Sequence, residues 1–143
     1  MKTKDLRLGN LVYKDGEIYR IESLGYHKSD SPWKNLVHSA SGDDDNICDY
    51  EPIRLTEEWL LKFGFRKYNN FLGHWYLKDC DYSIRYLRRK YICFACDGDI
   101  RFQLKANIQY VHQLQNLYFV LKGDELQVIE LPHSVSIHKT PRR

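Results

Sequence analysis

Cys93 and Cys96 form a Cys-x-x-Cys motif, which of all motifs in this sequence most directly suggests metal or redox chemistry. A zinc knuckle places such a pair in a turn so that both thiolates reach one ion, and a thioredoxin-type pair begins a helix. Here the motif lies in a predicted strand, where residues three apart point to opposite faces. The other cysteines and the six histidines are scattered singly. We therefore expect small buried side chains and no metal site.

A run of three acidic residues, Asp43 to Asp45, is the other arrangement that suggests a cation site. Calcium loops separate their ligands by intervening residues and bend at a glycine, which this run does not do. We expect a solvated loop.

A cluster of basic and aromatic residues is the strongest signal for nucleic acid. It consists of Arg85, Arg88, Arg89 and Lys90, interleaved with Tyr82, Tyr86 and Tyr91. Cations bind phosphates and aromatic rings stack on bases. Arg101 and Lys105 on a neighbouring strand extend the cluster. The alternative is a solvated hairpin tip with tyrosines on a sheet face.

An uncharged stripe lies on the predicted helix Asn107 to Gly123. The spacing of three, four and seven places His112, Gln115, Asn116 and Phe119 in one row. Solvated helix faces normally carry charge, yet no ionised side chain occurs between Ala106 and Leu121. Either another part of the chain covers the stripe, with the amides satisfying buried backbone groups, or a separate partner or second copy does. No carboxylate orients His112, so a catalytic role is not expected.

The usual enzyme motifs are missing from the sequence. There is no glycine-rich phosphate loop, no Gly-x-Ser-x-Gly and no His-Glu-x-x-His. We expect a non-enzymatic protein with no catalytic residues and no cofactor.

Around these residues the sequence predicts an α+β fold. Residues 1–55 are expected to form a small curled β-sheet or SH3-like barrel. Its strands are Leu8 to Tyr13 and Glu17 to Leu24, joined at Asp15-Gly16, with shorter ones at Leu36-Val37 and Ile47 to Leu55.

Residues 56–131 are expected to form a second unit, followed by a basic, mobile tail at 132–143. Thr56 begins a short helix, Glu57 to Phe63. An antiparallel meander follows, with strands at Phe65 to Tyr68, His74 to Lys78, Tyr82 to Leu87, Tyr91 to Cys96 and Asp99 to Lys105. The segment from Tyr82 to Tyr91 is also compatible with a short helix. Asn107 is the expected N-cap and Gly123 the expected C-terminal end of the long helix, which should pack across the meander. Leu126 to Leu131 should return as an edge strand.

Composition limits the function classes. The net charge of +3 is too small to indicate nucleic acid by itself, whereas eleven Tyr, six Phe and three Trp favour β-structure and aromatic contact surfaces. The sequence shows neither the apolar run of a signal peptide nor a stretch long enough to span a bilayer. We expect a cytoplasmic protein with free thiols and no membrane contact.

Three stretches resemble a family of short proteins encoded in gut anaerobic bacteria and their phages and prophages. They are LRLGNLVYKDGEIYRIESL (6–24), EPIRLTEEWLLKFGF (51–65) and YVHQLQNLYFVLKGDEL (110–126). The resemblance implies a cytoplasmic accessory protein, encoded by host or phage, and implies no particular activity. The insert from Gly25 to Asn46 and the tail after Leu131 depart from the family pattern.

These observations predict a small phage-type accessory protein that binds a protein partner or itself through the stripe. The first alternative is a nucleic-acid-binding module that uses the hairpin 82–91. A weaker alternative is a nucleotide-binding or nucleotide-sequestering protein.

Overall fold

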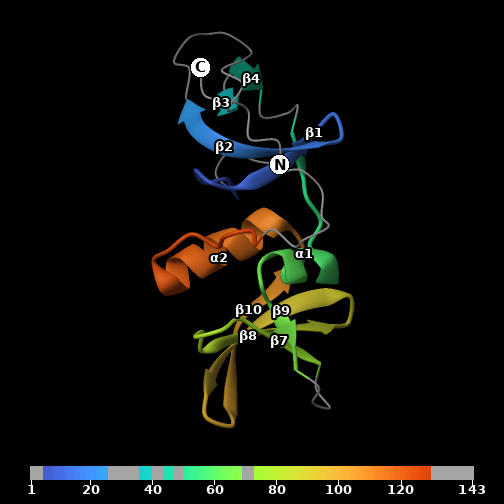
Figure 1. The fold of residues 1–143 in the computed structure, drawn as a ribbon, viewed down its shortest axis with the longest axis vertical. Helices are drawn as coiled ribbons and strands as arrows, with labels where there is room; N and C mark the ends of the chain where they lie inside the picture. Colours follow the sequence, from blue (N-terminus) through green and yellow to red (C-terminus); the bar gives the residue numbers. More distant parts are fainter. Residues whose placement is uncertain (1–4, 26–35, 40–43, 47–49, 69–72, 130–143) are drawn as a thin grey trace. The chain divides into compact units, whose positions relative to one another are not determined.

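The structure is a computed structural model, and it describes residues 5–25, 36–39, 44–46, 50–68 and 73–129. These residues form two compact units. Unit 1 contains the described residues up to 53 together with 110–125, and unit 2 contains 54–109 together with 126–129. Two antiparallel sheets and two helices confirm the predicted α+β class with a small N-terminal sheet (Figure 1). No helix among the described residues has the length and apolar character needed to cross a membrane.

The sheet of unit 1 has the strand order β4-β3-β2-β1-β5. The strands are β1 (Leu11–Lys14), β2 (Glu17–Gly25), β3 (Leu36–Ser39), β4 (Asp44–Asn46) and β5 (Glu51–Pro52). The predicted hairpin at Asp15-Gly16 is confirmed, because both residues have positive φ, 52° and 81°, as a type I′ turn requires. The acidic run lies partly in β4, and Asp43 lies outside the described residues.

The long helix α2 (Val111–Lys122) packs against β1 in unit 1. It ends at Gly123, whose φ of 72° confirms the predicted left-handed C-terminal position. The predicted N-cap at Asn107 is wrong, since Tyr110 occupies that position and its N–H donates to Gln113 Oε1 at 3.2 Å. Asn107 instead has a φ of 65° at the end of the last strand.

The division into units differs at α2 from the one expected, which placed this helix in a second unit spanning 56–131. The helix begins beside the end of the first sheet, where Val111 N–H donates to Ile53 O at 2.8 Å. Its buried residues, Val111, His112, Leu114 and Gln115, include two polar side chains, and polar side chains require hydrogen-bonding partners when they are buried. The backbone of the first sheet supplies some of those partners, as described below.

Unit 2 is a five-stranded antiparallel meander in the order β10-β9-β8-β7-β6, preceded by helix α1 (Glu57–Lys62). The strands are β6 (Arg66–Lys67), β7 (His74–Tyr76), β8 (Tyr82–Leu87), β9 (Lys90–Asp97) and β10 (Ile100–Ile108). Thr56 caps α1 as predicted, with Trp59 N–H donating to its Oγ1 at 3.4 Å. Residues 82–91 form a hairpin and no helix. In the described part of the predicted C-terminal strand, 126–129, no strand forms, and Ile129 N–H donates to Lys62 O at 2.7 Å.

The core of unit 2 lies between α1 and one face of the meander. Register places Trp75, Ile84 and Cys93 side by side on that face, where all three are buried. Helix α1 contributes buried Trp59 and Leu60. The start of β10 is not covered in this way, since Ile100 is 58% exposed and Phe102 is 57% exposed.

Candidate functional site

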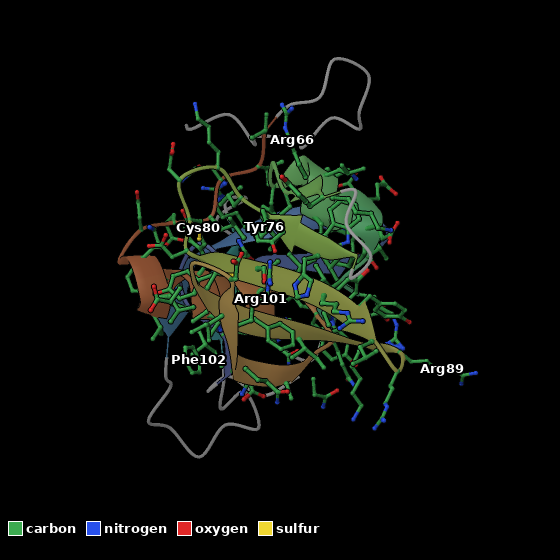
Figure 2. All side chains as sticks on the ribbon, turned by 90° about the horizontal axis from the view of Figure 1, so that it is seen from below. Arg66, Tyr76, Cys80, Arg89, Arg101 and Phe102 are labelled. Carbon is green, nitrogen blue, oxygen red and sulfur yellow. The ribbon has the colours of Figure 1, made fainter. Side chains whose placement is uncertain are left out.

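The second face of the meander is the candidate site, and we call it the open face because α1 lies on the other side of the sheet (Figures 1 and 2). Residues paired across antiparallel strands point to the same face. The register therefore assigns to the open face Arg66, Tyr68, His74, Tyr76, Ser83, Arg85, Leu87, Lys90, Ile92, Phe94, Cys96, Arg101 and Gln103. These positions carry no acidic residue, and the nearest acidic position along β8 is Asp81, just before the strand, whose carbonyl accepts from Cys96 N–H at 2.7 Å.

Arg101 and Tyr76 form the centre of the open face. The Arg101 guanidinium donates two hydrogen bonds to Tyr76 Oη, from Nε at 3.2 Å and from a terminal nitrogen at 2.7 Å. Figure 2 shows the two side chains together near the middle of the sheet. The hydrogen bond to Tyr76 raises the pKa of Arg101, so the guanidinium remains charged. Since both residues are only half-buried, a cation and a ring face solvent together.

Beneath this pair lies a small buried polar cluster. His74 and Ser83 are almost fully buried, and His74 Nδ1 lies 3.0 Å from Ser83 Oγ, to which Cys96 Sγ also donates at 3.5 Å. Burial lowers the pKa of His74, and the nearby positive charges of Arg101 and Arg85 lower it further. The imidazole is therefore neutral at neutral pH, and it belongs to the buried polar cluster of the open face.

Aromatic rings surround this buried polar cluster. The His74 ring lies 5.4 Å from the Phe94 ring and 6.0 Å from the Tyr76 ring, and Tyr68 meets Tyr76 edge-on at 5.8 Å. Tyr68 is 66% exposed. Flat rings on a strand face that α1, the described helix of this unit, does not cover can stack on planar ligands.

The cations on the two sides of the sheet differ in their partners. On the α1 side, Lys62 forms an ion pair with Glu58 at 2.7 Å and Lys67 with Glu57 at 3.2 Å. Within the described parts of the chain, Arg66, Arg85 and Arg101 of the open face have no carboxylate partner. The open face thus offers positive charge that the described chain does not neutralise.

The predicted basic and aromatic cluster is divided by the pleat of the sheet. Arg85 and Lys90 lie on the open face, whereas Tyr82, Tyr86 and Tyr91 lie on the other. Tyr91 is buried, its ring is 4.8 Å from that of Tyr86, and burial raises its pKa to about 12. These tyrosines do not stand beside Arg85 in the way that the sequence suggested.

Arg88 and Arg89 form the two-residue turn between β8 and β9. Their φ values are 51° and 63°, the left-handed values that Asn and Gly adopt at least cost in such a turn. Figure 2 shows Arg89 at the far end of this hairpin. Both side chains are exposed, so two cations lie at the end of the open face. The backbone of both residues is strained, because arginine rarely adopts a positive φ.

The Cys-x-x-Cys motif is split between the two faces, as its position in a strand predicted. Cys93 pairs with Ile84 on the α1 side and Cys96 with Arg101 on the open face. Burial raises the pKa of Cys93 to about 12, so its thiol stays protonated. No group of three or more metal-ligating side chains occurs among the residues that the structure describes.

The stripe on α2 is covered by the N-terminal segment 5–11 of the same chain, which is the first of the two alternatives raised by the sequence. Gln115 is 2% exposed, and its carboxamide accepts from Leu11 N–H at 2.9 Å and donates to Gly9 O at 3.1 Å. Asn116 accepts from Asn10 Nδ2 at 2.8 Å and donates to Asp5 O at 3.0 Å. Gln115 therefore bonds the segment as a neighbouring strand would.

Phe119 and His112, at the two ends of the stripe, also contact other residues of the chain. The Arg7 guanidinium lies 4.1 Å from the centre of the Phe119 ring and forms a two-pronged ion pair with Glu125. His112 is buried with its ring stacked on Tyr110 at 5.7 Å, and burial lowers its pKa. Of the predicted interface residues, Gln115, Asn116 and Phe119 contact the N-terminal segment, and His112 packs on Tyr110.

The sequence reasoning missed Tyr76, Phe94, Tyr68 and Arg66 as candidate site residues. A usable signal was present in the alternation of His74 and Tyr76, Ser83 and Arg85, and Phe94 and Cys96, which share one face once the strands pair in sequence order. Comparison with known proteins gives no match to a family model, a curated protein or a solved structure.

Proposed function

We propose that this protein binds single-stranded nucleic acid on the open face of its meander. The observation that carries the proposal is the Arg101–Tyr76 pair, a guanidinium held by two hydrogen bonds beside a half-buried ring, at strand positions that carry no acidic residue. Unpaired bases stack on aromatic rings and on arginine planes, and phosphates bind the cations between them.

The shape of the face favours single strands over duplex. A pleated sheet presents its rings side by side, which suits bases that are splayed out of a helix. A helix that reads a duplex must enter one of its grooves. In unit 2 the one described helix, α1, lies on the opposite side of the sheet.

The arginine turn between β8 and β9 extends the proposed surface. Arg85 and Lys90 lie on the open face next to this turn, and Arg88 and Arg89 continue the positive charge beyond the end of the sheet. A phosphate backbone that leaves the Arg101–Tyr76 centre along the strands would meet these cations next.

Fluorescence anisotropy with labelled 20-nucleotide dT and rU strands tests the proposal, with a 20-base-pair duplex as comparison. The wild type should bind the single strands more tightly than the duplex, and its affinity should fall steeply as salt increases. Arg101→Ala should weaken binding about tenfold and lower the slope of log affinity against log salt by about 0.7, the value for one phosphate contact on a single strand.

Matched variants separate charge from stacking. Arg20→Ala removes one exposed arginine from unit 1 and should leave the affinity unchanged. Tyr76→Phe keeps the ring, whereas Tyr76→Leu removes it and should cost about 1–3 kcal/mol of binding free energy. Absence of wild-type binding at low salt, or equal affinities for Arg101→Ala and the wild type, would refute the proposal.

The roles first predicted from the sequence remain predictions. A phage-type accessory protein that captures a protein partner would need a surface other than the stripe, because the amides of Gln115 and Asn116 already bond the chain itself. A nucleotide-sequestering role is tested by adding mononucleotides as competitors in the same anisotropy assay.

A further inference from the structure

The two ends of the meander carry opposite charge. At one end, the hairpin 82–96 contains four cations and no acidic residue. At the other end, the segments 77–81 and 97–99, which connect β7 to β8 and β9 to β10, contain four aspartates and one lysine. All four aspartates are exposed: Asp79, Asp81, Asp97 and Asp99. The open face therefore runs from a basic turn to two acidic connections, which we call the acidic end.

The acidic end begins next to the Arg101–Tyr76 centre. Asp81 C=O accepts from Cys96 N–H at 2.7 Å and Cys96 pairs with Arg101, so these three residues form one row across the sheet. Asp99 lies two residues before Arg101. The pKa of Arg101 is raised by its hydrogen bond to Tyr76 and, to a smaller extent, by the charge of Asp99. Among the cations assigned to the open face, Arg101 is therefore the closest to the acidic end.

The basic part of the open face is long enough for several nucleotides. From Asp81 to Arg88 in the arginine turn the chain advances seven residues, a path of about 24 Å at about 3.4 Å per residue. Arg85 and Lys90 lie on the open face along this path. A single strand that runs from the centre to the turn places its phosphates near cations, whereas one that continues past Arg101 places them near carboxylates.

We propose that the open face binds a free end of a single strand. The terminal nucleotide lies over the Arg101–Tyr76 centre, and the nucleotides that follow leave over the arginine turn. A strand that continued past the centre would bring further phosphates against Asp81 and Asp99, and like charges repel. A terminal nucleotide has no further phosphate on one side, so it avoids this repulsion. The inference rests on the proposed function and adds to it the class of strand that is bound.

Competition between linear and circular strands of one length and sequence tests the inference. The full-length protein is bound to labelled linear dT, and unlabelled dT of about 30 nucleotides, either linear or closed into a circle, displaces it in the anisotropy assay. A circle has no end, so it must pass the carboxylates or turn across the sheet. For the wild type, the linear strand should compete about fivefold better than the circle, or more.

Variants at the acidic end show whether its carboxylates cause this preference. Asp81→Asn with Asp99→Asn removes the two carboxylates nearest the centre and should bring the circle within about twofold of the linear strand. The matched control is Asp15→Asn with Glu51→Gln, which makes the same change in net charge at exposed positions of unit 1. It should keep the wild-type ratio. Thermal melts show whether each variant is folded.

Each outcome of the competition has a separate meaning. Equal competition by circle and linear strand in the wild type would overturn the inference and leave the proposed function standing. A preference that persists in Asp81→Asn with Asp99→Asn would also overturn it, because the carboxylates would then not be its cause. If the labelled strand does not bind at all, the proposed function itself fails.

Discussion

The stripe on α2 and the open face of the meander are both polar surfaces, and they differ in how far the chain itself uses their hydrogen-bonding capacity. Each amide of Gln115 and Asn116 bonds the segment 5–11. The guanidinium of Arg101 meets a phenol, and among the described residues no carboxylate pairs with it. Uncharged polar side chains can be buried once they are bonded, whereas an unpaired cation remains at the surface. Charge without a counter-charge is therefore the better guide to a free surface in this molecule.

Gln115→Ala provides the strongest test of this difference. The substitution leaves Leu11 N–H and Gly9 C=O without their partner, and we expect a loss of about 2–4 kcal/mol in the free energy of unfolding. Urea denaturation measures the loss, and faster amide hydrogen exchange at Leu11 would locate it. Gln127→Ala, at an exposed position, should change stability by less than about 0.5 kcal/mol. Equal effects of the two substitutions would contradict the structural role of the stripe.

Replacing the two arginines of the β8–β9 turn should increase stability, whereas Gln115→Ala should decrease it. Arg88→Asn with Arg89→Gly supplies the residues that a type I′ turn favours, so we expect a gain of about 1–2 kcal/mol in stability. The same double variant should bind single strands less tightly, because two cations are lost. Denaturant titration and anisotropy on one preparation measure both quantities. If stability rises while affinity is unchanged, the turn does not belong to the binding surface.

His74 and His112, buried histidines of unit 2 and unit 1, provide a smaller, pH-dependent test. Their folded-state pKa values lie below the unfolded value of about 6.5, so the unfolded state takes up protons first as pH falls. The free energy of unfolding should be constant above about pH 6.5 and decrease below it. Arg101→Ala should raise the pKa of His74 and leave that of His112 unchanged, because Arg101 acts only on the former. An NMR titration of the imidazole protons measures each pKa, and equal shifts at both would contradict this account.

Arg101→Ala should have the smallest effect on stability. The guanidinium is half-exposed and its lost partner is one phenol, so the urea midpoint should move no further than it does in the Gln127→Ala control. Urea denaturation checks this alongside the binding assay. A loss as large as that of Gln115→Ala would mean that the open face holds the fold together as the stripe does, and the contrast between the two surfaces would disappear.

The strands and turns of the fold could be predicted because their signals are local. Asp15-Gly16 marks a turn by its backbone preferences, and Tyr82 to Leu87 reads as a strand by composition. The partner of α2 could not be read in this way. Its choice depends on Gln115 meeting the backbone of residues 9 and 11, a contact distant in sequence that no periodicity encodes.

The candidate site was only partly predictable for a related reason. The basic cluster at 85–90 was visible as a run of cations, but a run along one strand alternates between faces. Tyr76 and Arg101 meet across neighbouring strands, and their pairing appears only when the register of β7 through β10 is known. Sequence indicated the residue types of a binding surface, and the pleat determined which of them share it.

Strand β6 is too short to extend the sheet readily by pairing with another chain. At the far edge of the meander this strand has only two residues, Arg66 and Lys67, and both are basic. A charged stub of that length offers too few free amides for another chain to add on. Strand addition at this edge of the meander would therefore gain few backbone hydrogen bonds and would have to bring a second chain against two positive charges.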